Sequence, residues 1–173
     1  MSRRVVDLPL ESLPFVDEHS IVIAASPDQV WDALLETVGD FTGDRGGSRI
    51  AGALGCEQTD RAGKPGRIGS TVPGFVVTRS VRPAVLALMG AHRFARYALV
   101  FQISETPLEP VILSAVTRAE FPGRRGRAYR LAVIGTRGHV VVLRSVLHTV
   151  RKKAERAVAG AALAGNSPTS EGR

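Results

Sequence analysis

Two consecutive stretches near the middle of the chain alternate apolar and polar side chains with a period of two. They cover residues 93–104 and 111–121. This period puts successive side chains on opposite faces of a β-strand. If the connection pairs like parities, one face would hold Tyr97, Leu99, Phe101 and Ile103 of the first strand and Leu113, Ala115, Thr117 and Ala119 of the second. The alternation therefore predicts an antiparallel sheet with one buried and one solvated face.

The periodicity changes after Pro122-Gly123. Apolar residues then recur at helical spacing, which predicts a long helix over residues 138–158 and outweighs the β-branched run 140–142. The stripe consists of Val140, Leu143, Leu147, Val150, Ala154 and Ala157. A shorter helix is expected over residues 127–134. Together these patterns predict an α+β fold in which a curved antiparallel sheet wraps around a long C-terminal α-helix.

A strand followed by a capped helix is predicted near the N-terminus. Residues 18–25 alternate as a strand, and Ser26 can then accept a hydrogen bond from the third helical N–H while Gln29 reaches back. Pro27 suits the first helical position. We expect this helix to end at Gly39.

The stretch between this helix and the alternating strands is rich in glycine. Its hydrophobic residues 50–56 are predicted to form a strand, and two further strands are expected over residues 71–81 and 84–89. Turns are expected at Arg82-Pro83 and at residues 90–92. A meander is the simplest connection for successive strands.

The length of 173 residues suits one domain with a single core. Residues 1–16 show neither strand nor helix periodicity and are predicted to be an N-terminal arm. Residues 161–173 end in small, polar and charged side chains and are predicted to be a disordered tail. The folded domain is therefore expected to span residues 17–160.

Cysteine and histidine usage bears on metal sites and on the cellular compartment. Cys56 is the only cysteine, so no intrachain disulfide or multi-cysteine metal site can form. The four histidines lack the spacing of metal-binding motifs, and no glycine-rich phosphate loop is present, so we expect neither a metal nor a cofactor. No apolar stretch is long enough for a membrane span or a secretory signal. These features favour a cytoplasmic location.

Charge is distributed unevenly along the chain, whose formal net charge is +7. Residues 1–40 hold two arginines against eight acids, a net charge of −6, and residues 118–156 hold eleven bases against two acids, a net charge of +9. Such a basic face can bind nucleic acid, an anionic membrane surface or an acidic ligand group. The aromatic content of 5% argues against single-stranded nucleic acid, which needs stacking platforms.

The order of elements and the opening residues resemble a known superfamily. The segment from His19 to Leu34 reads HSIVIAASPDQVWDAL, with a strand, a serine before proline and a Val30-Trp31 pair on the first helix. This resembles the START-like (SRPBCC) superfamily with its helix-grip fold, over roughly residues 17–158. The resemblance implies a cavity between sheet and C-terminal helix for lipids, polyketides or other apolar molecules. The second helical stretch and the arginine-rich last helix depart from the superfamily's usual pattern.

Six residues are candidate ligand contacts in such a cavity: Trp31, Tyr97, Phe101, Thr117, Leu143 and Leu147. The hydroxyls of Tyr97 and Thr117 would orient a ligand among apolar neighbours. The alternative for each residue is ordinary core packing. The superfamily has no universal catalytic motif, so no catalytic residue is assigned.

Three functions fit the sequence. The first is binding of a hydrophobic small molecule, such as a lipid, acyl chain or polyketide-like molecule, without catalysis. The second is a cyclase or dehydrase type of enzyme, in which Tyr97 or His92 moves protons, or a histidine works beside an acid such as Glu57 or Glu120. The third is a module that uses the basic residues 118–156 to bind nucleic acid or anionic membrane. The sequence indicates no oligomeric state.

Overall fold

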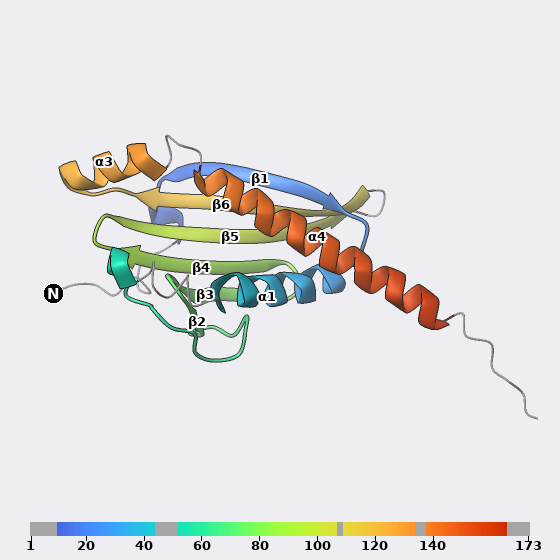
Figure 1. Cartoon of the computed structure of the whole chain (residues 1–173). Helices are drawn as coiled ribbons and strands as arrows, with labels where there is room; N and C mark the ends of the chain where they lie inside the picture. Colours follow the sequence, from blue (N-terminus) through green and yellow to red (C-terminus); the bar gives the residue numbers. More distant parts are fainter. Residues whose placement is uncertain (1–9, 44–51, 107–108, 134–137, 166–173) are drawn as a thin grey trace, which may run out of the picture.

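A computed structural model describes residues 10–43, 52–106, 109–133 and 138–165. Within these residues six strands form one antiparallel sheet in the order β1-β6-β5-β4-β3-β2 (Figure 1). The strands are β1 (Phe15–Ile23), β2 (Thr71–Val72), β3 (Phe75–Val81), β4 (Val85–His92), β5 (Ala95–Thr106) and β6 (Glu109–Glu120). The helices are α1 (Pro27–Gly43), α3 (Gly123–Val133) and α4 (Gly138–Gly165), and a 3-10 turn spans Leu10–Ser12.

Helices α1 and α4 pack on one face of the sheet. Figure 1 shows α4 running diagonally from the β1 and β6 side of the sheet toward α1. Their apolar side chains join those of the strands in one core, in which Leu34 of α1, Phe101 of β5 and Val150 of α4 are at most 1% exposed. The predicted α+β fold, with a curved antiparallel sheet around a long C-terminal helix, is confirmed. Among the described helices none is long and apolar enough to cross a membrane.

The register between β5 and β6 confirms the predicted shared face. Tyr97 lies opposite Ala119, Leu99 opposite Thr117, Phe101 opposite Ala115, and Ile103 opposite Leu113. The inner face therefore carries the eight residues that the alternation predicts. On the outer face, Leu13 packs with Met89 and Ala98 in a second, smaller core cluster, so the last residues of the predicted arm pack against the sheet.

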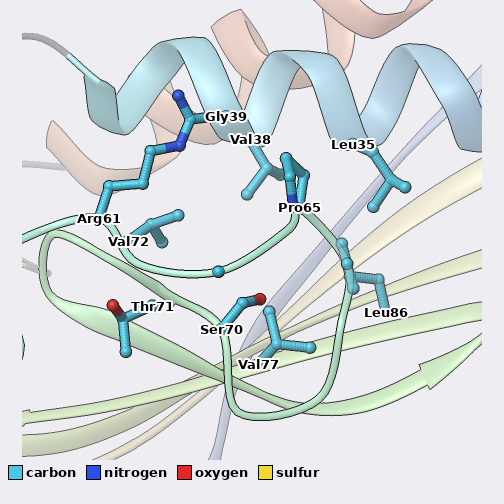
Figure 2. A pocket seen from close by; sticks show the side chains of 12 residues that line it. Leu35, Val38, Gly39, Arg61, Pro65, Ser70, Thr71, Val72, Val77 and Leu86 are labelled. Carbon is cyan, nitrogen blue, oxygen red and sulfur yellow. The ribbon is translucent and has the colours of Figure 1, made fainter.

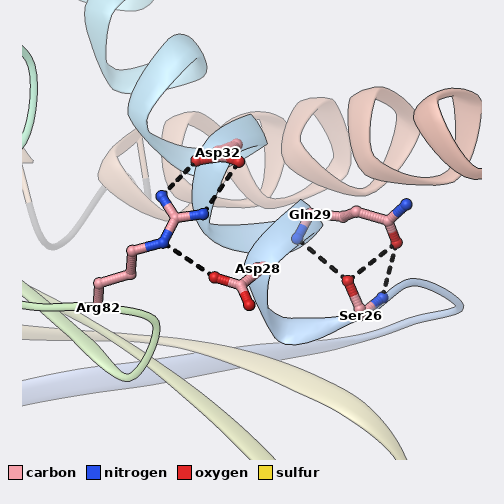
Figure 3. Close-up of polar contacts among 5 residues, drawn as sticks. All are labelled: Ser26, Asp28, Gln29, Asp32 and Arg82. Atoms are coloured by element: carbon pink, nitrogen blue, oxygen red, sulfur yellow. Dashed lines mark hydrogen bonds and ion pairs between the residues drawn. The ribbon is translucent and has the colours of Figure 1, made fainter.

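Strand β1 and the start of α1 follow the predicted pattern. β1 spans Phe15–Ile23 instead of residues 18–25, because its pairing with β6 begins at Phe15. The Ser26 N–H donates to Gln29 Oε1 at 2.9 Å, and the Gln29 N–H donates to Ser26 Oγ at 3.3 Å, so the predicted reciprocal cap is confirmed (Figure 3). Arg82, in the turn after β3, donates to Asp28 and Asp32 and holds that turn against α1 (Figure 3).

The predicted end of the first helix at Gly39 is wrong, since α1 continues to Gly43. A glycine costs only about 1 kcal/mol in a helix interior, so tertiary contacts can carry a helix through it. Lys153 of α4 supplies such contacts, with its Nζ 2.8 Å from Glu36 Oε1 and 2.6 Å from Asp40 Oδ2. A side chain on Gly39 would also overlap the Arg61 guanidinium, so this glycine allows a close approach.

Two predicted strands take other forms. The prediction of a strand at 50–56 is wrong over residues 52–54, which are helical, with the Gly55 N–H donating to the Gly52 carbonyl at 3.0 Å; residues 50 and 51 lie outside the described residues. The continuous strand at 71–81 is also wrong, because Pro73 and Gly74 form a tight turn between β2 and β3. Gly74 has φ +86°, a value that suits glycine in a turn after proline.

The turn predicted at residues 90–92 is wrong, since β4 continues to His92 and the turn falls at Arg93-Phe94. Gly90 stands inside the strand because the Tyr97 ring of β5 lies across it. A Cβ at Gly90 would come within 2.6 Å of that ring. The glycine is therefore a packing requirement and not a turn signal.

The C-terminal elements are longer than predicted. α3 begins at Gly123 instead of residue 127, and α4 continues to Gly165 instead of residue 158. α4 thus crosses the predicted domain boundary at residue 160. The division into an arm, a domain and a tail stays a prediction, and residues 1–9 and 166–173 lie outside the described residues.

Candidate ligand-binding site

The inner face of the sheet has two parts that differ in what covers them. We call the part under α1 and α4 the covered half. We call the part around Tyr97, Leu99 and Thr117 the open half, because these three side chains remain partly exposed. In Figure 1 neither α1 nor α4 lies over the ends of β4 and β5 next to α3.

The covered half is filled with side chains. Four of the predicted ligand contacts lie in its single apolar core: Trp31 is 3% exposed, Phe101 1%, Leu143 6% and Leu147 2%. The structure therefore brings these four residues together as parts of the core.

A small cavity remains beneath α1, between this helix and the segment that leads into β2 (Figure 2). Leu35 and Val38 of α1 face Pro65, Val72 and Leu86 across it (Figure 2). Its volume is about 10 Å³, which is about the room that one water molecule needs. This cavity is too small for an organic ligand.

Tyr97 is the central aromatic residue of the open half. Its hydroxyl donates to the Gly74 carbonyl at 2.8 Å and lies 3.8 Å from Cys56 Sγ. The Phe75 ring meets it edge to face at 5.1 Å between centroids. Burial, together with the neighbouring Cys56, raises the pKa of Tyr97 far above its usual range, so the phenol stays neutral. The ring is fixed in place and presents an uncharged surface.

His92 lies beside Tyr97, with 5.5 Å between the ring centroids. Its Nδ1 accepts a hydrogen bond from the Phe94 N–H at 3.1 Å, so the neutral ring carries its proton on Nε2. Burial, and secondarily the charge of Arg93, lowers the pKa of His92. The Tyr129 ring of α3 meets it edge to face at 4.8 Å. His92 is therefore a neutral imidazole within an aromatic cluster.

A group of polar atoms lies on the inner face where β1 and β6 meet the start of α4. Asp17 Oδ2 lies 2.6 Å from His139 Nε2 and 3.5 Å from His19 Nε2. Within the described residues, Asp17 Oδ1, His19 Nε2 and Thr117 Oγ1 are buried without a hydrogen-bond partner. Leaving a buried polar group unsatisfied costs about 1–3 kcal/mol. Water or the polar part of a ligand would remove this cost.

Sequence reasoning missed the contact between Asp17 and His139. The signal was present in β1, where Asp17 and His19 fall on the same inward parity as Ile21 and Ile23. The histidine partner lies 122 residues further along the chain, so no local pattern reveals it. The two acids that the sequence suggested as partners of a histidine have other surroundings. Glu120 pairs with Arg96 at 3.0 Å, and Glu57 is exposed.

The six predicted contacts thus fall into two groups. Tyr97 and Thr117 belong to the open half, and the other four belong to the core under the helices. Among the described residues no three metal-ligating side chains come close enough to hold an ion.

The predicted basic face is spread over α3 and α4. Arg124, Arg125, Arg127 and Arg130 of α3 are all exposed, and Leu131 beside them is 74% exposed. Binding of nucleic acid or anionic membrane by this face stays a prediction.

Comparison with known proteins identifies the fold. No family model and no curated protein matches the sequence. The structure is similar to the ZhuI aromatase/cyclase from Streptomyces sp. R1128, with a TM-score of 0.50, 17% identity, and coverage of 84% of this chain and 96% of that chain. It is also similar to a point mutant of norcoclaurine synthase from Thalictrum flavum in complex with a transition state analogue, with a TM-score of 0.50, 14% identity, and coverage of 84% and 99%. At these identities the likeness concerns the fold alone.

Proposed function

We propose that this chain, which has the helix-grip fold of the START-like (SRPBCC) superfamily, binds an uncharged hydrophobic small molecule on the open half. The observation that carries the proposal is the buried Thr117 hydroxyl, which has no hydrogen-bond partner among the described residues and stands opposite the partly exposed Leu99. Apolar walls with a few unsatisfied polar atoms are typical of ligand sites.

The side chains of the open half favour a neutral ligand. Tyr97 is an uncharged phenol and His92 a neutral imidazole, and both present aromatic surface. Thr117 could donate to or accept from a carbonyl or hydroxyl group. A lipid, acyl chain or polyketide-like molecule with a single polar group fits this combination.

The other four predicted contacts would take part in one of two ways. Phe101 borders the open half from the core side, since it follows Leu99 on the inner parity of β5, and Leu143 belongs to the same core cluster as Phe101. Trp31 is 3% and Leu147 2% exposed, so they would meet a ligand of the open half only if the core around them opened. Their contact with a ligand is part of the proposal.

A neutral fluorescent dye, N-phenyl-1-naphthylamine, tests the site. We expect the protein to bind one dye molecule saturably, and Leu99→Arg to weaken binding by at least about tenfold, because a charge would enter the apolar wall. Leu131→Arg is the matched control, since Leu131 is 74% exposed on α3. Thermal unfolding of each variant shows that it is folded.

Native mass spectrometry of gently purified protein detects the natural ligand if one is retained. A stoichiometric apolar adduct that Leu99→Arg removes and Leu131→Arg retains supports the proposal. A clean apo mass together with equal dye affinity in both variants contradicts it.

A second candidate function is catalysis of the cyclase or dehydrase type. It is favoured by the 5.5 Å contact between His92 and Tyr97, which places a neutral imidazole beside a phenol. The names of the two similar structures, an aromatase/cyclase and a norcoclaurine synthase, are names of enzymes. Conversion of a ligand identified by mass spectrometry, abolished in His92→Gln while binding persists, would establish this function. If the protein binds this ligand without converting it, the result favours a binding protein over an enzyme.

A further inference from the structure

A groove lies on the other flank of α4, between this helix and the edge strand β1. Its volume is about 270 Å³, much larger than that of the cavity beneath α1. It is lined by His19, Ser20 and Ile21 of β1 and by Arg144, Leu147 and His148 of α4. The groove residues lie on β1 and α4, whereas the residues that define the open half lie on β5 and β6.

The wall that α4 contributes carries an arginine and a histidine, Arg144 and His148, and neither forms an ion pair with an acid among the described residues. Arg144 and His148 lie one helical turn apart and therefore side by side on the helix surface, and both are exposed. Two other basic residues of α4 are paired: Lys153 with Glu36 and Asp40, and Arg151 with Glu155. Within the described part of the chain, no carboxylate pairs with Arg144. Of the two acids on β1, Glu18 is exposed, and Asp17 is held by His139 at 2.6 Å.

The rest of the groove consists of two polar residues, His19 and Ser20, and two apolar ones, Ile21 and Leu147. Ile21 packs against the core and Leu147 is only 2% exposed, so both present carbon atoms in fixed positions. Ser20 is exposed at the rim and can donate a hydrogen bond. An arginine guanidinium binds carboxylates through two parallel hydrogen bonds. The groove thus combines a carboxylate-binding group with an apolar surface a few carbon atoms long.

We propose that this groove binds the carboxylate of a small aliphatic acid, with Arg144 and His148 on the carboxylate, Ser20 as an additional donor, and Ile21 and Leu147 against the aliphatic part. The acid is a second ligand, distinct from the neutral molecule of the open half. Apart from Ile21 and Leu147, its site depends on side chains that are not part of the hydrophobic core.

Hexanoate is the probe, with hexan-1-ol as its neutral equivalent and inorganic phosphate as a purely ionic competitor. Binding is followed by amide chemical shifts of the full chain at low ionic strength. We expect hexanoate to shift the amides of residues 19–21 and 144–148 saturably, and Arg144→Gln to weaken binding by about tenfold or more, because a hydrogen bond to a charged group is lost. Arg156→Gln, the same change at an exposed position on the same helix, should leave the affinity within about twofold.

Three results would overturn the proposal. They are equal losses in Arg144→Gln and Arg156→Gln, equal affinity for hexan-1-ol, or equal affinity for phosphate. The Leu99→Arg variant separates the two sites, since it should abolish dye binding at the open half and leave hexanoate binding unchanged. Loss of hexanoate binding in that variant would assign the acid to the open half and contradict a separate groove.

Discussion

Phe101 and Leu99 stand two residues apart on the same face of β5, yet Phe101 is 1% exposed and Leu99 remains partly exposed. On β4 each of them stands opposite a leucine, Leu88 for Leu99 and Leu86 for Phe101. The difference comes from the opposite side, where α1 and α4 cover Phe101 and no described helix covers Leu99 to the same extent. The covering helices therefore decide which part of the inner face becomes core and which part remains partly exposed.

Truncating a side chain to alanine should lower stability more in the covered half than in the open half. Phe101→Ala is expected to lower the free energy of unfolding by about 3–5 kcal/mol, because it leaves a cavity in a packed core. Leu99→Ala should cost only about 1 kcal/mol, since part of its side chain already contacts solvent. Urea unfolding of both variants measures the difference. Equal costs would mean that the open half is packed like the core.

Gly90→Ala tests how the Tyr97 ring is held over the sheet. The new Cβ would overlap the Gly74 carbonyl oxygen and come within 2.6 Å of the Tyr97 ring. We expect a loss of about 1–3 kcal/mol from overpacking, together with a change in the near-ultraviolet circular dichroism of tyrosine. Gly160→Ala is the control, because nothing lies within 4 Å of a Cβ at that position. An unchanged tyrosine signal would contradict the described packing of Tyr97.

Two threonine-to-valine changes should have opposite signs. Thr117→Val removes a buried hydroxyl that has no partner among the described residues, and should raise stability by about 1 kcal/mol. Thr37→Val, in the covered half, removes a hydroxyl that donates to the Ala33 carbonyl at 2.7 Å, and should lower stability by about 1 kcal/mol. Thermal unfolding decides the signs. A loss in Thr117→Val would show that its hydroxyl is already satisfied, for example by water.

The smallest effect concerns pH. Burial and the charge of Arg93 lower the pKa of His92 in the folded protein, whereas in the unfolded chain it takes up a proton near pH 6.5. Its contribution to stability is therefore complete above about pH 6.5 and is lost as the pH falls below that value. His92→Gln should show a shallower decrease of stability between pH 6.5 and pH 5 than the unchanged protein. Parallel curves would contradict a lowered pKa for His92.

The sequence predicts the sheet, its inner face and the long helix because these follow from periodicities that many residues share. Two of the errors occur at single glycines that were interpreted as local breaks. Gly39 lies within a helix that Lys153 supports from α4, and Gly90 lies within a strand because Tyr97 needs the space. Both reasons come from distant segments that a local pattern does not contain.

The candidate site was predictable only in part, for the same reason. Alternation places Tyr97 and Thr117 on the inner face but does not say where the covering helices end. The Asp17–His139 contact joins residues 122 positions apart and needs the fold before it can be found. Which inner residues are core and which are open is a property of the packed helices.

A titration of the methyl-labelled protein with N-phenyl-1-naphthylamine tests most directly whether a ligand binds on the open half and not in the covered half. We expect saturable shifts of the Leu99 and Thr117 methyl resonances, while those of Leu34, Leu147 and Val150 in the covered half stay unchanged. Shifts confined to Leu34, Leu147 and Val150 would contradict the account, because the ligand would then lie beneath the helices, and so would the absence of any saturable shift.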